Sequence, residues 1–359
     1  MTHLWFYAAS RVRSQIKPAS CPRRINYAGQ HAAPHAPNSA RRTMENPVLP
    51  ADQEPDVSVL MTVYNGMPYL AEAVESIRAQ TYSRWKMIIV DDGSTDESGD
   101  YLDSLDDDRI TVLHQDNAGT AVASNHGLKL CDTEFLARMD SDDICDPTRL
   151  EKQVAFLRDH PSVGLVGSQI VPRGAQKAGR VIPLATDHQS IYSQLRKGQH
   201  AMCHPTILMR TALLKGIGGY WKQHGMFDAW DMFLRMGEVG ELANLPEPLL
   251  EYRIHTGSIN GKHMRKLQAS IEFACELARR REENLPEIAY EDYFAQRERA
   301  GLANRLAKQI NVYALLQYRL ASIDLLGGHR LRGYARLAWS GLCSPGRSVN
   351  RLLRQLKLA

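Results

Sequence analysis

The stretch FLARMDSDD, residues 135–143, is an apolar, strand-like run that ends in three carboxylates, Asp140, Asp142 and Asp143. Three carboxylates within four residues repel one another at neutral pH, so their clustering is unfavourable unless a cation lies among them. The carboxyl end of a strand is also where α/β proteins bind ligands. Because no His or Cys cluster adjoins the aspartates, we expect a hard cation with oxygen ligands, Mg²⁺ or Mn²⁺.

Two simpler interpretations of the acidic run remain open. It could begin the helix that the pattern predicts for residues 148–158. It could also be an EF-hand-like loop, since Asp140, Asp142 and Glu151 fall at loop positions 1, 3 and 12. Position 6, however, is Cys145, where the sharp turn of an EF-hand requires glycine. We therefore favour a cation site of another class.

Buried-strand patterns alternate with helical patterns through the first half of the chain. The expected strands are VSVLMTV (57–63), KMIIV (86–90), ITVL (110–113), FLARM (135–139) and VGLVG (163–167). After the first of them, an Asn65-Gly66 turn leads to a helix whose apolar face is Leu70, Ala73, Val74 and Ile77. After the second, a helix is predicted to start at Ser94, with Glu97 placed for a capping box. This alternation predicts an α/β fold with a doubly wound, mostly parallel sheet.

The ends of the chain differ from its middle in charge. The whole chain carries +4; residues 1–44 contribute +7 without an acid, and residues 301–359 contribute +9 with Asp324 as their single acid. Residues 45–300 therefore carry −12. We expect a disordered basic extension over residues 1–55, with Met44 as an alternative start, an α/β domain over 56–260 and a helical, basic region over 261–359.

The cysteine and hydropathy patterns indicate the cellular compartment of the protein. The six cysteines are scattered without a CxxC pair, as expected of free thiols in a reducing environment. No run is long and apolar enough for a membrane span, and the N-terminus lacks a secretory apolar core. The acid-free start resembles a mitochondrial transit peptide only faintly. We expect a cytoplasmic protein.

The absence of two nucleotide-binding motifs narrows the classes of nucleotide-binding protein to which the chain could belong. The first strand is followed by YNGMPY in place of GxGxxG, and GxxxxGK[ST] is absent, which disfavours dinucleotide dehydrogenases and P-loop ATPases. A nucleotide held without a glycine cradle needs its diphosphate charge neutralised, and a carboxylate-bound metal does that. Asp91 and Asp92 end the second strand; they could cap the next helix, or one of them could accept hydrogen bonds from a base or ribose.

The ordered motifs together resemble a family 2 glycosyltransferase of the GT-A fold. The resemblance spans residues 57–260 and includes VSVLMTVYNG (57–66), IIVDDGSTD (88–96), MDSDD (139–143), HPTILMR (204–210) and LLEYRIHTGSIN (249–260). It implies a nucleotide-sugar and metal half over 56–168 and an acceptor half over 169–260.

The resemblance also implies roles for single residues. Val63, Tyr64, Asn65 and Asn117 would line the nucleotide-sugar pocket, and Asp92 would contact the base or ribose. Asp140 and Asp142 match the DxD motif, which holds the metal against the donor diphosphate, with Asp143 close by. His204 would shape the acceptor side, and Tyr252, Arg253 and His255 match a late motif that folds back near the diphosphate.

One departure concerns the catalytic base. The family commonly carries Glu-Asp-x-Asp, whereas this chain reads Asp228-Ala229-Trp230-Asp231, so the usual base position is Ala229. Asp228 could act from one residue away, Asp231 could serve, or both could be structural.

The resemblance implies an inverting glycosyltransferase that moves a sugar from a nucleoside-diphosphate sugar, with a UDP-sugar as the expected donor, to a glycan or lipid-linked glycan in surface polysaccharide or glycolipid assembly. The alternatives are a catalytically impaired nucleotide-sugar-binding homologue and a metal-dependent nucleotidyltransferase.

The tail RSVNRLLRQLKLA (347–359) spaces leucines and basic residues as a helix lying on anionic lipid would, or as an ordinary packed helix. The first interpretation predicts a peripheral protein on the inner face of the cytoplasmic membrane. Nucleic acid is not expected as a partner, since the body is acidic and no recognised binding motif occurs.

Overall fold

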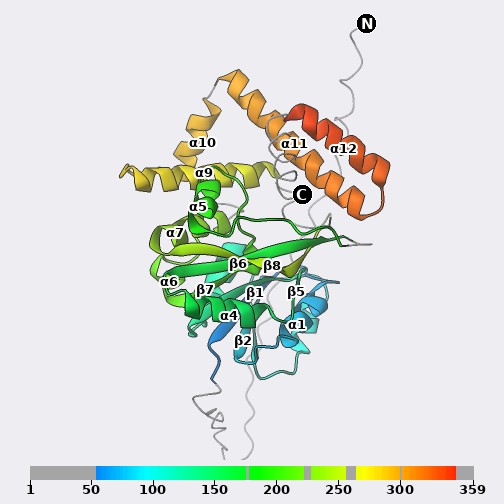
Figure 1. Cartoon of the computed structure of the whole chain (residues 1–359), viewed down its shortest axis with the longest axis vertical. Coiled ribbons are helices and arrows are strands. Elements are labelled where there is room, and N and C mark those ends of the chain that lie inside the picture. Colours follow the sequence, from blue (N-terminus) through cyan, green and yellow to red (C-terminus); the bar gives the residue numbers. More distant parts are fainter. Residues whose placement is uncertain (1–53, 175–177, 222–227, 256–263, 300, 345–359) are drawn as a thin grey trace, which may run out of the picture. The chain divides into compact units, whose positions relative to one another are not determined.

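The structure is a computed structural model that describes residues 54–174, 178–221, 228–255, 264–299 and 301–344 (Figure 1). The basic extension expected over residues 1–55 and the tail after residue 344 lie almost wholly outside these residues. The first strand among the described residues begins at Val57, where the sequence pattern predicts it.

A single mixed sheet organises the described residues. Its order is β3-β2-β1-β4-β7-β6-β8-β5, and β3, β2, β1 and β4 run parallel to one another. β7 is antiparallel to β4 and β6, β6 and β8 are parallel, and β5 is antiparallel to β8. The doubly wound, mostly parallel α/β fold is therefore confirmed. The strands are β1 (Val57–Val63), β2 (Trp85–Asp91), β3 (Ile110–His114), β4 (Phe135–Asp140), β5 (Ile144–Cys145), β6 (Val163–Arg173), β7 (Leu208–Arg210) and β8 (Glu241–Arg253).

Each face of the sheet is covered by its own hydrophobic core; α1, α2 and α4 contribute to one core, and α3, α5, α6, α7 and α9 contribute to the other. Figure 1 shows helices packed around the sheet. The predicted apolar face of α1 is buried against the first core. The helices of this part are α1 (Leu70–Arg78), α2 (Ser98–Asp103), α3 (Thr120–Leu128), α4 (Arg149–Asp159), α5 (His188–Arg196), α6 (Thr211–Gly216) and α7 (Asp228–Val239), with a 3-10 turn η1 (His204–Thr206).

The described residues from 264 to 344 form a helical region, as the sequence predicts. α9 packs on α5 and α7, and α11 and α12 pack together as a helical hairpin. Its helices are α9 (Met264–Glu282), α10 (Tyr290–Glu298), α11 (Leu302–Leu326) and α12 (Arg330–Cys343). Among the residues that the structure describes, no helix combines the length and apolarity that crossing a membrane requires.

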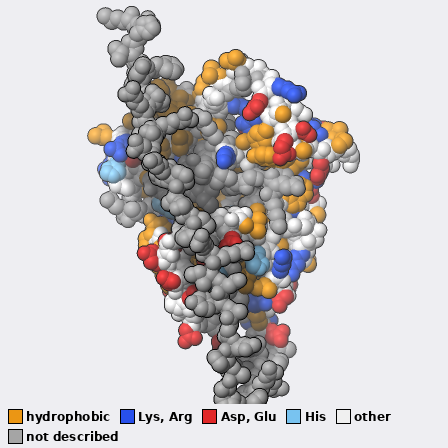
Figure 2. All heavy atoms as spheres, turned by 180° about the vertical axis from the view of Figure 1, so that it is seen from behind, with side chains coloured by type: hydrophobic (Ala, Val, Ile, Leu, Met, Phe, Trp, Pro, Cys, Tyr) orange, Lys and Arg blue, Asp and Glu red, His pale blue; other side chains and the backbone are white. Residues whose placement is uncertain are grey.

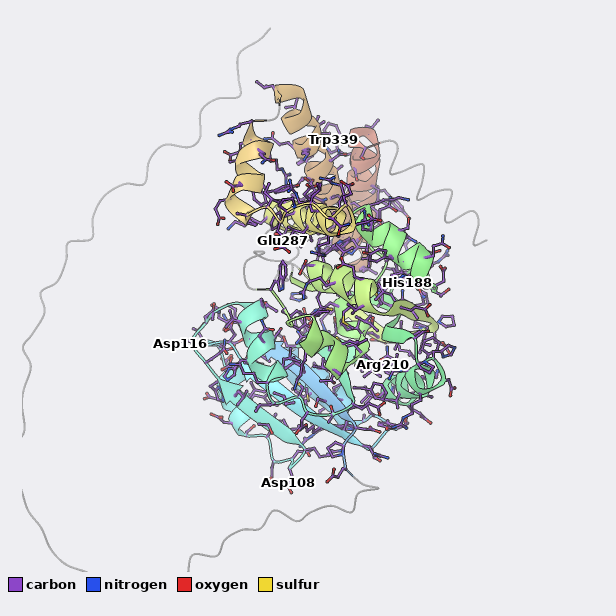
Figure 3. All side chains as sticks on the ribbon, turned by 90° about the vertical axis from the view of Figure 1, so that its left-hand side faces the viewer. Asp108, Asp116, His188, Arg210, Glu287 and Trp339 are labelled. Carbon is purple, nitrogen blue, oxygen red and sulfur yellow. The ribbon has the colours of Figure 1, made fainter. Side chains whose placement is uncertain are left out.

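The loop after β2 corrects one prediction. α2 begins at Ser98 rather than Ser94, and Glu97 makes no side-chain cap. Asp91 Oδ1 accepts the N–H of Ser94 at 3.0 Å, and Asn65 Oδ1 accepts the N–H of Thr95 at 2.7 Å. Because these side chains satisfy the donors, residues 94–96 remain a loop at the carboxyl edge of the sheet. Asp108 and Asp116, which flank β3 in Figure 3, mark the amino and carboxyl ends of that strand.

Gly93 in this loop supplies the first prediction. Its φ is +75°, and a Cβ there would lie 2.8 Å from the main-chain N of Asn117. Gly93→Ala should lower the free energy of unfolding in urea by about 1–3 kcal/mol, because it adds both left-handed strain and a backbone clash. Gly216→Ala is the control: a Cβ at Gly216 meets nothing within 4 Å, so stability should stay level or rise slightly. Equal effects at the two glycines would contradict this interpretation.

Candidate functional site

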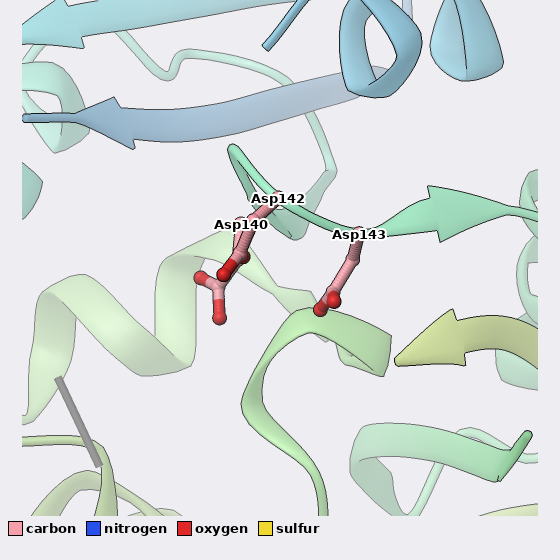
Figure 4. Close-up of side chains that lie close together, drawn as sticks. All are labelled: Asp140, Asp142 and Asp143. Atoms are coloured by element: carbon pink, nitrogen blue, oxygen red, sulfur yellow. The ribbon is translucent and has the colours of Figure 1, made fainter. Parts of the chain in front are cut away.

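The three aspartates lie on the short loop that leaves β4. Asp140 is the last residue of β4, and β5 begins at Ile144. One carboxylate oxygen from each of Asp140, Asp142 and Asp143 lies within 4.8 Å of the others, and Figure 4 shows the three side chains close together. Asp140 and Asp142 are partly exposed, whereas Asp143 is 1 % exposed.

Asp143 is the unusual member of this group. Its Oδ1 accepts one hydrogen bond, and its buried Oδ2 has no hydrogen-bond partner among the described residues. Burial raises the pKa of this carboxyl well above its usual value, and the nearby charges of Asp142 and Asp140 raise the pKa further. A buried carboxylate oxygen without a donor is unfavourable unless a cation or proton meets it. The cluster therefore fits a hard divalent cation with oxygen ligands.

The late motif of the sequence meets this loop through strand pairing. Ile144 and Cys145 of β5 pair with Glu251 and Leu250 of β8, so the end of β8 runs beside the acidic loop. The main-chain N–H of Arg253 donates to Asp143 Oδ1 at 2.8 Å, and Arg253 Nε donates to the carbonyl of Asp142 at 2.8 Å.

His255 Nε2 lies 2.9 Å from Asp142 Oδ2. Arg253 and His255 therefore lie against the DxD-like residues, although more than 100 positions separate them in the sequence.

The sequence pattern did not identify the residues that hold Arg253 from its other side. Glu72 of α1 accepts from Arg253 Nη2 at 2.6 Å, and the guanidinium lies 4.4 Å over the ring of Tyr69. Glu72 occupies the solvent side of an ordinary amphipathic helix, and no sequence signal distinguishes it from a surface glutamate. Together α1, the acidic loop and the end of β8 enclose the arginine.

A buried arginine, which the sequence pattern also did not identify, lies behind the acidic loop. Arg138 of β4 is fully buried, two residues before Asp140 and so on the same face of the strand. Its Nη2 is 3.3 Å from Thr62 Oγ1 and 3.8 Å from Asp140 Oδ1, while Nε and Nη1 have no hydrogen-bond partner in the described part of the chain. The positive charge offsets part of the repulsion among the three aspartates.

Asp92 holds the neighbouring loop. It is 4 % exposed, and its carboxylate accepts from Gln115 Nε2 at 2.7 Å, from the N–H of Ala118 at 2.9 Å and from the N–H of Gly119 at 2.8 Å. Neither Asp91 nor Asp92 caps α2. Asp92 instead fixes the loop that carries the exposed Asn117 at the carboxyl end of β3. A direct contact between Asp92 and a base or ribose stays a prediction.

The loop after β1 completes this edge. Val63 is buried, and its carbonyl accepts the N–H of Asp92 at 2.8 Å. Tyr64 is 53 % exposed and so presents its ring to solvent. Asn65 adopts a φ of 52° and bridges to the loop after β2. Val63 thus ends β1, while Tyr64, Asn65 and Asn117 lie on loops at the carboxyl ends of β1 and β3, the parallel strands on either side of β2. α/β proteins bind nucleotides at this edge of the sheet.

His204 lies on the side assigned to the acceptor. It begins η1, its Nε2 is 3.2 Å from the hydroxyl of Tyr220, and its ring packs edge-on against Phe233. Burial lowers the pKa of His204 well below its usual value, and the charge of Arg138 lowers the pKa further. Asn125 of α3 fixes Tyr220 by accepting its main-chain N–H at 2.9 Å.

α7 carries both candidates for the catalytic base. Asp231 is fully buried, its Oδ2 accepts from Arg235 Nε at 2.7 Å, and Arg235 also donates to the carbonyls of Ile217 and Gly219. Asp231 therefore holds the segment before Tyr220. Asp228 is the first residue of α7, but its side chain lies outside the described residues. Ala229, at the usual base position, is 3 % exposed.

Comparison with known proteins gives the class. Residues 58–218 match the sequence profile of Glycosyl transferase family 2. The chain is 33 % identical over 208 residues to EpsE of Bacillus subtilis, named as a glycosyltransferase, across 55 % of this chain and 73 % of EpsE. It is 28 % identical over 212 residues to the amylovoran biosynthesis glycosyltransferase AmsE of Erwinia amylovora, across 56 % of this chain and 78 % of AmsE.

The chain belongs to glycosyl transferase family 2, and its mixed α/β sheet agrees with the GT-A fold that the resemblance to this family implies. Among solved structures it is similar to S. aureus TarS 1–349 in complex with UDP-GlcNAc, at 18 % identity and a TM-score of 0.49, over 84 % of this chain and 92 % of that one. A likeness at this level does not bear on the substrate.

The lowered pKa of His204 predicts a pH dependence. Below pH 6.5 the unfolded chain protonates this imidazole while the folded chain does not, so stability falls as the pH drops toward the folded-state pKa. His204→Gln should reduce the loss of unfolding free energy between pH 6.5 and 5.5 by up to about 1 kcal/mol. Urea unfolding of both proteins at the two pH values measures it. An unchanged slope in the variant would show that His204 is protonated normally in the fold.

Proposed function

We propose that the protein is a metal-dependent, inverting glycosyltransferase that moves a sugar from a nucleoside-diphosphate sugar to an acceptor hydroxyl. One observation carries the proposal: in a family 2 member, Asp140, Asp142 and Asp143 cluster against Arg253 and His255 at the carboxyl edge of the sheet. A diphosphate needs both a cation ligand set and fixed donors, and this edge offers both.

The three aspartates are the proposed ligands of Mn²⁺ or Mg²⁺. When bound, the ion would neutralise negative charge on the diphosphate leaving group. His255 orients the carboxylate of Asp142, as hydrogen-bond partners of metal ligands commonly do. Arg253 brings a guanidinium to the same loop, where it can stabilise charge that develops on the leaving group.

Asp228 is the proposed general base. It would remove the proton from the acceptor hydroxyl as that oxygen attacks the anomeric carbon, and one such displacement inverts the configuration. The buried ion pair of Asp231 with Arg235 supports a structural task for Asp231, because an acceptor hydroxyl would have to reach a carboxylate that has no exposed surface.

The division of the chain follows from these roles. Residues 56–168 would bind the donor and metal, with Val63, Tyr64, Asn65, Asp92 and Asn117 around a UDP-sugar. Residues 169–260 would receive the acceptor beside His204. The name of the relative AmsE, an amylovoran biosynthesis glycosyltransferase, supports a role in polysaccharide assembly. The proposed acceptor is a glycan, free or lipid-linked, and the proposed location is the cytoplasmic side of the membrane.

A donor screen tests the proposed function. The full chain is incubated with UDP-, GDP- and TDP-sugars, Mn²⁺ or Mg²⁺ and candidate acceptors, and the released product is identified. Metal-dependent release of nucleoside diphosphate from one donor class is expected. Release of pyrophosphate would instead identify a nucleotidyltransferase.

Ala229 favours a second candidate, a homologue that binds nucleotide sugars without transferring them. Such a protein would bind UDP in the presence of Mn²⁺, yet would release no nucleoside diphosphate from any donor in the screen.

Substitution of the proposed base provides the sharper prediction. Asp228→Asn should lower turnover at least about 100-fold, because general-base assistance typically contributes 10²–10⁴-fold, while donor affinity stays near normal. Asp231→Asn is the matched comparison and should mainly reduce stability, since it breaks a buried ion pair with Arg235. Steady-state kinetics and urea unfolding separate the two effects. Near-normal turnover in Asp228→Asn would assign the base elsewhere.

A further inference from the structure

The outer helix of the C-terminal hairpin has a well-defined inner face. α12 packs on α11 through Gly333 and Ser340, both buried. A Cβ at Gly333 would lie 2.6 Å from Leu325 Cγ, and Ser340 Oγ donates to the carbonyl of Ala314 at 2.7 Å. These contacts settle which side of α12 faces outward.

The outward side of α12 is apolar. At about 100° per residue, its exposed apolar residues fall within an arc of roughly 140° that contains no charged residue. Arg330 and Arg332, both exposed, lie at about 100° on either side of Leu331 and so border the arc. Figure 2 shows hydrophobic side chains open to the surface in the upper, helical part, and Figure 3 labels Trp339. The residues are Leu331 (90 % exposed), Tyr334 (63 %), Ala335, Ala338, Trp339 (52 %) and Leu342 (76 %).

This pattern reverses that of an ordinary surface helix, which turns its apolar stripe to the core and its charges to water. A contiguous exposed apolar surface rimmed by polar residues marks a contact with a protein or a membrane. α11 adds a second such stripe at its start, because Leu302, Leu306, Ile310 and Tyr313 are exposed at helical spacing.

The charge around the arc indicates which kind of partner this apolar face binds. Asp324 is the only carboxylate in the sequence of residues 301–344, and it is buried beside Arg336. Arg332 Nη1 also lies 3.9 Å from Asp324 Oδ1. The hairpin therefore combines exposed apolar side chains, two ring residues suited to the lipid headgroup level and an excess of arginines over carboxylates. A symmetric pair of these faces would bring the arginine borders of two copies together, which disfavours self-association.

We propose that the outer face of α12, between Arg330 and Arg332, docks on an anionic lipid bilayer. The helix lies along the surface, with its leucines and rings among the headgroups and acyl chains and its arginines on lipid phosphates. This surface is distinct from the basic tail 345–359, and the proposal does not depend on sugar transfer.

Vesicle flotation of the full chain tests the proposal. The wild type should float with phosphatidylcholine vesicles that contain phosphatidylglycerol, and at least 10-fold less with phosphatidylcholine alone. The Leu331→Glu/Leu342→Glu double variant should lower the partition coefficient on the anionic vesicles at least 10-fold. Val239→Glu, which alters a 51 % exposed residue at the end of α7, is the control and should float as the wild type does. Circular dichroism verifies that each variant is folded.

Two outcomes would overturn the proposal. The first is unchanged flotation of the folded double variant, including the case in which deletion of residues 345–359 alone abolishes flotation. The second is a double variant that shifts the sedimenting mass from dimer to monomer while its flotation matches the wild type, since the face would then join two copies of the chain.

Discussion

The hydrogen bond from the main chain of Arg253 to Asp143 is the interaction on which the site depends. It joins the end of β8 to the loop after β4, and the pairing of β5 with β8 fixes its register. Because the donor is a main-chain N–H, the contact needs the strand and not a particular side chain. The arginine side chain then reaches Asp142 and Glu72, and His255 follows two residues later against Asp142. One strand end thus organises the acidic loop.

A second constraint is the burial of charge around this loop. Asp143, Arg138 and the Asp231–Arg235 pair are all nearly or fully buried, and buried charges are unfavourable unless they are paired or coordinated. Arg235 Nε donates to Asp231 Oδ2, and Arg235 also donates to the carbonyl of Gly219, which fixes the segment before Tyr220. Asp143 and Arg138 retain polar atoms without partners in the described residues. Such atoms occur elsewhere too, as at Asp231 Oδ1. At the acidic loop, the proposed metal ion would supply the partner that Asp143 Oδ2 lacks.

Local patterns in the sequence predict much of the fold. The apolar runs locate β1, β2, β3 and β4, the face of α1 is recognisable from its spacing, and the acidic cluster lies at the end of β4 as expected. Long-range contacts were not predictable from such patterns. The prediction of a capping box at Ser94 was wrong, because Asn65, about 30 residues earlier, accepts the main-chain N–H groups of Thr95 and Asp96. In the sequence alone, Glu72 resembles a surface glutamate and Arg138 resembles an ordinary strand residue. Their contacts with the site form only when the folded sheet brings β8 and the acidic loop together. The resemblance to family 2 pointed to Arg253 and His255, which helical or strand periodicity alone would not have identified.

The central claim is that the acidic loop and the end of β8 form one site for a metal ion and a nucleoside diphosphate. Calorimetric titration of Mn²⁺ with and without saturating UDP tests it most directly. Because coupling between two ligands of one site is reciprocal, Mn²⁺ should bind at least about tenfold more tightly when UDP is present. Asp142→Asn should remove this coupling, and Asp108→Asn, on the exposed loop before β3 (Figure 3), should preserve it. An Mn²⁺ affinity that is the same with and without UDP would contradict the account.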